Sequence, residues 1–214
     1  MHTATIIPLK EKEIHIPSGN LSLEGRLYQQ STDYGLIVTH PHPLYGGDMH
    51  NRVVDIVQQV FAQKNFTTLR FNFRGTGQSQ GRYDNGHGEQ EDVLAAVGLL
   101  EQIGVGTIVL AGYSFGAWIN ALASDRLPDR MQLVMISPPV AFIDFEDVQT
   151  MANLALIITG SRDEIAPPAQ VKKLASNWNP KARLEIIHGA DHFYSMMYKR
   201  LEEILGGFAA GFIG

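Results

Sequence analysis

The chain has 214 residues, 44% of them hydrophobic and 18% charged, a composition typical of a soluble globular protein rather than a disordered or fibrous one. Its formal net charge of −5, without any cluster of Lys and Arg, argues against a nucleic-acid partner. The sequence contains no cysteine, which excludes disulfides, thiolate metal sites and cysteine nucleophiles. The lack of cysteine also fits a reducing cytoplasm.

Neither end of the sequence predicts secretion or membrane insertion. Residues 1–16 lack a basic start followed by a long apolar core, so we expect no secretory signal. The apolar residues 204–214 are too few to span a bilayer, and we expect them to pack on the domain or to fray. We therefore expect a cytoplasmic protein with no membrane span, either a monomer or a homodimer.

Strands and helices alternate along the chain. Alternation of apolar and polar residues predicts an antiparallel hairpin over 12–17 and 21–28. Further segments follow in the order strand 35–40, helix 53–61, strand 66–73, helix 89–103, strand 107–111, helix around 118–122, strand 131–137, strand 154–160, helix 168–177, strand 183–188 and helix 192–205. Several of these strands are apolar throughout, which indicates a mostly parallel sheet with helices on both faces. Residues 1–214 are expected to form a single α/β domain.

The segment 107–124 carries the most specific motif. An apolar strand runs directly into Gly112-Tyr113-Ser114-Phe115-Gly116 and then into helical spacing, and a G-x-S-x-G motif in this context predicts a nucleophile at Ser114. The turn is so tight that Ser114 is expected to be strained, and Gly112 and Gly116 let strand and helix approach without a Cβ. By composition alone this motif arises by chance in about one such chain in ten, so it needs support from the rest of the sequence.

That support lies in the loops that follow later strands. Asp163 comes after the strand 154–160 and His192 after the strand 183–188, and the carboxyl ends of parallel strands meet at one edge of a sheet. A neutral imidazole accepts the proton of a serine hydroxyl, and a carboxylate orients the imidazole, so Ser114, Asp163 and His192 predict a catalytic triad. Glu164, Asp144 and Asp147 are alternative acids and His188 is an alternative base, whereas we interpret Asp191 as the cap of the last helix.

Acyl transfer at a serine also needs backbone N–H groups that stabilise an oxyanion. The residue after the nucleophile, Phe115, supplies one such N–H. The loop 40–47 supplies the other, and because Pro41 and Pro43 have no N–H, the first available donors are His42 and Leu44. We favour His42.

These motifs together resemble those of the α/β-hydrolase superfamily over essentially the full chain. The segments 40–51 (HPHPLYGGDMHN), 71–81 (FNFRGTGQSQG), 86–93 (GHGEQEDV), 112–116 (GYSFG), 163–167 (DEIAP) and 191–193 (DHF) resemble a group of small, lid-less bacterial hydrolases regarded as predicted serine esterases. The resemblance implies the triad Ser114, Asp163 and His192, and a sheet of strand order 1-2-4-3-5-6-7-8 with an antiparallel second strand. The substrates of that group are largely unassigned.

Two other patterns partly match known cofactor and metal motifs, but both are incomplete, so we expect no cofactor and no metal. Gly75-x-Gly77 follows a strand, but the third glycine of a dinucleotide fingerprint is displaced to Gly81. We expect a structural role for this loop, with Arg74 paired to Glu89 or Asp92. His40, His42 and His50 lie near Asp48, but no spaced carboxylate completes a known ligand pattern.

The sequence thus predicts a serine esterase that acts on a small-molecule acyl substrate. The segment between Ser137 and Leu154 is too short for a cap domain, so we expect an open site and small or short-chain acyl groups, with Tyr45, Phe142 and Phe193 as walls. An acyltransferase or peptidase with the same triad is the alternative within the class. A non-catalytic binding protein on the same fold is the alternative outside it.

Overall fold

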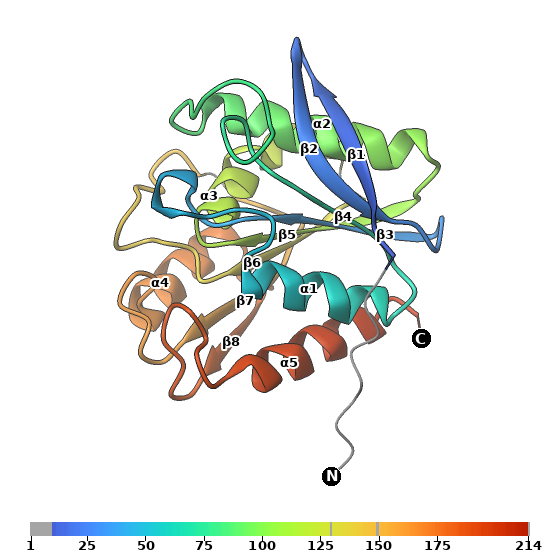
Figure 1. Cartoon of the computed structure of the whole chain (residues 1–214). Helices are drawn as coiled ribbons and strands as arrows, with labels where there is room; N and C mark the ends of the chain where they lie inside the picture. Colours follow the sequence, from blue (N-terminus) through green and yellow to red (C-terminus); the bar gives the residue numbers. More distant parts are fainter. Residues whose placement is uncertain (1–9, 129, 149, 214) are drawn as a thin grey trace.

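The computed structural model describes residues 10–128, 130–148 and 150–213 (Figure 1). Residues 1–9, which belong to the segment from which we expect no secretory signal, lie outside the described residues. Within the described part of the chain, no helix is long and apolar enough to cross a membrane.

An eight-stranded sheet has the order β1-β2-β4-β3-β5-β6-β7-β8, and the antiparallel second strand is confirmed. The strands after β2 pair in parallel. Their bounds are β1 Lys12–Ser18, β2 Leu21–Tyr28, β3 Tyr34–Thr39, β4 Thr67–Phe71, β5 Thr107–Tyr113, β6 Gln132–Ile136, β7 Leu154–Gly160 and β8 Arg183–Ile187. Each lies within a few residues of its predicted segment.

Helices cover both faces of the sheet, as Figure 1 shows. Their bounds are α1 Arg52–Ala62, α2 His87–Gln102, α3 Phe115–Leu122, α4 Pro168–Trp178 and α5 Tyr198–Ala210, with short 3₁₀ turns at Pro43–Tyr45 and Ser124–Arg126. The residues of α1 and α5 pack in one apolar cluster, and those of α2, α3 and α4 pack in another. Successive residues of a central strand join opposite clusters, Leu36 and Val38 with α1 and α5 but Ile37 with α2 and α3. Apolar runs without alternation arise because both faces are buried.

The last helix begins later than the sequence predicts. We expected helix from His192, but α5 begins at Tyr198. The Asp191 carboxylate accepts hydrogen bonds from the N–H groups of Phe193 and Ser195 in a turn, so it does not cap α5. Tyr194 and Met196 have φ values of 56° and 68°, which no α-helix accommodates. These residues therefore form a loop at the carboxyl end of the sheet.

Candidate active site

The turn between β5 and α3 has the strained geometry that the motif predicts. Ser114 adopts φ 53° and ψ −117°, a conformation that L-residues rarely occupy. A Cβ at Gly112 would lie 2.5 Å from the Ala117 nitrogen, and one at Gly116 would lie 2.5 Å from the Thr39 hydroxyl. Only glycine fits at either position, and the turn holds the Ser114 side chain at the edge of the sheet.

The structure brings Ser114, His192 and Asp163 into one hydrogen-bonded chain. The Oγ of Ser114 lies 3.0 Å from Nε2 of His192, and Nδ1 of His192 lies 3.0 Å from each carboxylate oxygen of Asp163. Ser114, Asp163 and His192 are 8%, 2% and 7% exposed, so these bonds are protected from bulk water. A proton on Nδ1 facing the carboxylate leaves Nε2 as the acceptor for the Ser114 hydroxyl.

Asp163 is held ionised beside His192. Burial raises the pKa of its carboxyl, but the hydrogen bond and charge of His192, the Ala166 N–H and the Ser137 hydroxyl together hold that pKa below its ordinary value. The N–H groups of Ile165 and Ala166 donate to Oδ1 at 3.0 and 2.7 Å. The loop after β7 thus fixes the carboxylate before any substrate binds.

The alternative triad members lie away from this chain of hydrogen bonds. Three side chains that we kept as alternative acids are exposed to solvent: Glu164, Asp144 and Asp147. His188, the alternative base, is also exposed, because it lies just past the end of β8 at the edge of the sheet.

Tyr113 anchors the loop that carries His192. Its hydroxyl donates to the His192 carbonyl oxygen at 2.9 Å, and the two rings lie 5.6 Å apart. Tyr113 is the variable residue before the serine of the motif, and sequence reasoning assigned it no role. Its place at the end of a buried strand is the signal that indicates a packed, hydrogen-bonded side chain.

The loop after β3 presents the backbone of His42 to the site. Phe115 and His42 both line the cavity beside Ser114, and neither N–H donates to another backbone group in the described chain. The Phe115 N–H also lies at the positive end of α3. The His42 carbonyl accepts from Tyr45 and Gly47. A Cβ at Gly47 would lie only 2.1 Å from the Pro41 oxygen, so the loop closes tightly on itself.

His40 holds that loop in place through hydrogen bonds at both of its ring nitrogens. Its Nδ1 donates to the Pro41 carbonyl at 2.7 Å, and its Nε2 accepts from the Phe73 N–H at 3.0 Å. Complete burial lowers the pKa of His40 to about 4, so the ring is neutral near pH 7. Sequence reasoning considered His40 only as a metal ligand. The structure shows both ring nitrogens already engaged.

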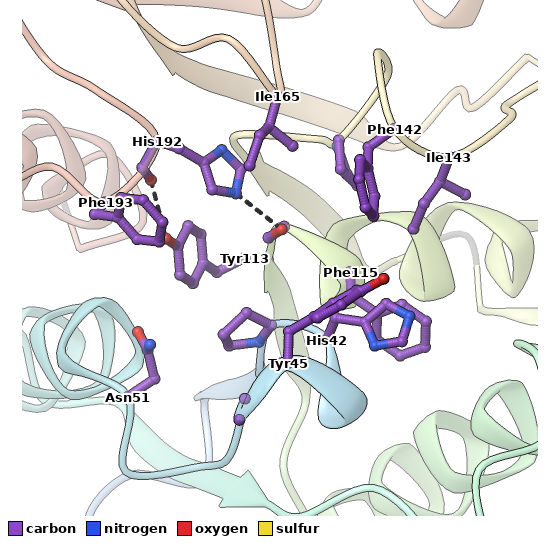
Figure 2. Close-up of a pocket in the computed structure, with 15 residues that line it drawn as sticks. His42, Tyr45, Asn51, Tyr113, Phe115, Phe142, Ile143, Ile165, His192 and Phe193 are labelled. Atoms are coloured by element: carbon purple, nitrogen blue, oxygen red, sulfur yellow. Dashed lines mark hydrogen bonds between the residues drawn. The ribbon is translucent and has the colours of Figure 1, made fainter.

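Ser114 lines a cavity of about 360 Å³. Figure 2 shows the residues that surround this cavity. Its walls are mainly aromatic and aliphatic, and the three side chains that we predicted as walls line it: Tyr45, Phe142 and Phe193. They are 73%, 61% and 62% exposed, so the mouth of the cavity is open. Residues 138–153, between β6 and β7, contain no helix or strand in their described part, so no cap covers the cavity from there.

A scan against models of known protein families finds no match. The chain is 38% identical over 191 residues to the uncharacterized protein RP471 of Rickettsia prowazekii (strain Madrid E), covering 83% of this chain and 79% of that protein. It also superposes on solved structures. An α/β serine hydrolase homologue from Coxiella burnetii has a TM-score of 0.83, 36% identity and coverage of 94% of this chain and 98% of its own. XC6422 from Xanthomonas campestris, an α/β serine hydrolase without a lid, has a TM-score of 0.82, 32% identity and 94% coverage of each chain.

The chain belongs to the α/β-hydrolase superfamily. The strand order and the relatives above 30% identity agree on this point. The similarity to serine hydrolases supports a hydrolase on this fold.

In the loop that carries Gly75 and Gly77, other side chains of the protein occupy the space where a dinucleotide phosphate would bind. The N–H of Gln78 and the amide of Asn72 donate to the Glu24 carboxylate, and a Cβ at Gly77 would collide with both acidic and amide groups. A carboxylate at this point repels a phosphate. Arg74 pairs with Asp92, one of its two predicted partners, at 2.7 Å.

The histidine cluster offers little to a metal ion. His40 uses both ring nitrogens within the protein, and the ring of His42 accepts from the Leu44 N–H. Across residues 10–128, 130–148 and 150–213, no group of three or more His, Cys, Asp or Glu side chains lies close enough to hold a metal.

Proposed function

We propose that this α/β hydrolase is a carboxylesterase-like serine hydrolase that cleaves small or short-chain acyl esters. The observation that carries the proposal is the continuous path from Ser114 Oγ through the His192 ring to Asp163, with each step at 3.0 Å. A serine hydroxyl is a weak nucleophile by itself. A buried hydrogen-bonded path to an imidazole makes it reactive, because the imidazole accepts the hydroxyl proton.

In the proposed acylation step, Ser114 Oγ attacks the ester carbonyl carbon and its proton passes to His192 Nε2. Asp163 stabilises the imidazolium that forms. The carbonyl oxygen becomes an oxyanion, which the N–H groups of Phe115 and His42 stabilise. The carbon–oxygen bond to the alcohol then breaks, and the alcohol leaves with the proton from His192.

In the proposed deacylation step, water replaces the alcohol. His192 takes a proton from the water as the oxygen attacks the acyl carbon, and it returns that proton to Ser114 Oγ as the acid is released. The open mouth of the cavity supports hydrolysis, because water has direct access to the acyl-enzyme. An acyltransferase would need to exclude water at this stage.

The size of the cavity supports a small acyl group. A volume of about 360 Å³ lies near the lower end of the range for small-molecule sites. Long acyl chains would extend past Tyr45 and Phe142 into solvent and gain little further burial.

The proposal is tested by treating the purified protein and its Ser114→Ala variant with a fluorophosphonate probe and weighing both by intact mass. We expect one adduct on the wild type and none on the variant. A series of p-nitrophenyl esters from acetate to decanoate then gives the acyl preference, which we expect to be highest at short chains. Folded wild type that gains no adduct over hours would contradict the proposal and favour a non-catalytic binding protein.

A further inference from the structure

The cavity has no charged wall. None of the described residues that line it is Asp, Glu, Lys or Arg. Burial lowers the pKa of His42, so this ring is neutral near pH 7 and adds no cation. Asp163 lies behind the His192 ring and is only 2% exposed, so its carboxylate does not form part of the wall. A charged substrate group entering the cavity would lose hydration without gaining a counter-ion, which is unfavourable.

The amide of Asn51 is one of the polar groups in the wall that has an unused donor. Asn51 caps α1, and its Oδ1 accepts from the Val53 N–H at 2.9 Å. This bond fixes the plane of the amide. Its Nδ2 has no acceptor within the described chain, and the half-buried side chain lines the cavity. The cap bond thus preorients the Asn51 amide, and its N–H₂ group remains available to a substrate in the cavity.

The cavity has two unlike sides, as Figure 2 shows. Asn51 and Phe193 lie on one side of His192, and Phe142 and Ile143 lie on the other. On the second side the ring of Tyr45 lies 5.9 Å from that of Phe142 and 4.9 Å from that of His42. One side of the cavity is therefore mainly aromatic and aliphatic, whereas the other combines the Phe193 ring with the Asn51 amide.

We propose that the site selects uncharged esters, and that Asn51 Nδ2 donates a hydrogen bond to a neutral acceptor oxygen on the substrate arm that lies beside Phe193. This inference rests on the proposed esterase function and specifies its substrate class. The favoured substrate has an apolar arm on the side of Phe142 and an arm with an ester, ether or hydroxyl oxygen on the side of Asn51.

Two matched sets of esters test the proposal, one for each arm of the substrate. The acyl set consists of p-nitrophenyl octanoate, p-nitrophenyl methyl adipate and p-nitrophenyl hydrogen adipate. The first two have equal chain lengths and differ in the acceptor oxygens, and the third replaces the methyl ester by a carboxylate. The alcohol set consists of octyl acetate and the acetate esters formed at the terminal hydroxyl of methyl hydroxyhexanoate and of hydroxyhexanoic acid. Hydrolysis of this set is measured by the release of acetate.

In the wild type we expect each carboxylate substrate to have a kcat/KM at least about tenfold below that of its methyl ester. In one of the two sets, the methyl ester should also exceed the apolar compound by about fivefold, as one hydrogen bond provides. Equal kcat/KM for the carboxylate and its methyl ester in both sets would overturn the selection of uncharged esters.

Variants of Asn51 test the hydrogen bond separately from the helix cap. Asp and Ser cap helices about as well as Asn, so Asn51→Asp and Asn51→Ser should keep the start of α1 while removing the N–H₂ donor. We expect the preference for the methyl ester over the apolar compound to fall at least about fivefold in both variants. The matched control is Gln63→Glu, which makes the same amide-to-acid change at the exposed far end of α1 and should keep the wild-type preference.

An unchanged preference in folded Asn51 variants, checked by thermal melting, would overturn the role of Asn51. Hydrolysis of p-nitrophenyl acetate with no discrimination in either set would remove this inference and leave the esterase proposal intact. Folded wild type that neither binds the fluorophosphonate nor hydrolyses any ester would remove both.

Discussion

The Oγ of Ser137 lies 2.7 Å from the phenol oxygen of Tyr194, and both side chains are fully buried. Ser137 follows β6 and Tyr194 lies two residues after His192, and both have positive φ, 46° and 56°. Burial raises the pKa of Tyr194, so its hydroxyl stays protonated. The Tyr194 hydroxyl also lies 3.4 Å from the Ile158 carbonyl oxygen, a longer contact than the one with Ser137. Because Asp163 is ionised, the favourable arrangement has Tyr194 donating to Ser137 and the Ser137 proton directed toward the carboxylate. The pair thus joins the loops after β6 and β8 to Asp163, the acid of the proposed triad.

Tyr194→Phe tests this pair. We expect kcat on p-nitrophenyl acetate to fall about three- to tenfold with little change in KM, because Asp163 and His192 lose support without any change in the cavity wall. The free energy of unfolding should fall by about 1–2 kcal/mol, because the buried Ser137 hydroxyl loses a partner. Steady-state kinetics and urea denaturation measure the two effects. Tyr28→Phe, on the remote strand β2, is the matched control and should change neither. An unchanged kcat in Tyr194→Phe would restrict the pair to a folding role.

Substitution of the two adjacent carboxylates, Asp163 and Glu164, tests which of them is the acid of the proposed triad. Asp163→Asn keeps the shape of the side chain but removes the charge and favours the wrong tautomer of His192, so we expect kcat to fall by about 10³–10⁴-fold. Glu164→Gln, one residue away and exposed, should retain activity within about twofold. The measurement is kcat/KM on p-nitrophenyl acetate. The opposite ranking of the two variants would show that Glu164 is the acid.

Ser114→Gly and Ser114→Ala should differ in stability. Both abolish labelling by the fluorophosphonate, but only glycine adopts φ 53°, ψ −117° without strain. We expect the Gly variant to be more stable than the Ala variant by about 1 kcal/mol or more, measured by chemical denaturation at pH 7. Equal stabilities would mean that the turn relaxes when the hydroxyl is removed.

The low pKa of His40 predicts that the free energy of unfolding decreases in mild acid. Its pKa is about 4 in the folded protein and about 6.5 in the unfolded chain, so the unfolded chain binds a proton first as the pH falls. The contribution of His40 is complete above pH 6.5 and decreases down to about pH 4, by about 3 kcal/mol in total. Denaturation at pH 7.5 and 4.5 should show this decrease, and His40→Asn should be less stable but less dependent on pH. NMR that shows His40 titrating near 6.5 in the folded protein would contradict the assignment.

The fold and the hydrogen-bonded arrangement of Ser114, His192 and Asp163 could be predicted from the sequence because their signals are local. Apolar runs mark strands that are buried on both faces, and the Gly-x-Ser-x-Gly spacing marks a turn in which no Cβ fits at Gly112 or Gly116. Asp163 and His192 follow parallel strands, and the direction of those strands brings their loops to one edge. The strand order itself came from resemblance to a family, since pairing between strands leaves little trace in a single sequence.

The last loop shows where local signals are insufficient. Residues 192–205 have helical spacing of apolar side chains, yet Tyr194 turns inward to Ser137 and the helix begins only at Tyr198. Contacts between residues distant in the chain, here separated by 57 positions, override the local preference.

The sequence by itself thus determined the alternation of strands and helices, the strained serine and the types of its two partners, because each depends on side-chain periodicity or on backbone sterics within a few residues. The sequence favoured Asp163 over Glu164, and the tertiary structure shows that Asp163 contacts His192. The tertiary structure alone decided that His40 supports the loop of His42 and that Asn51 lines a cavity without charged side chains in its wall. Each of these depends on which atoms lie within about 3 Å across the fold, and hydrogen bonds are too short-ranged for spacing along the chain to specify them.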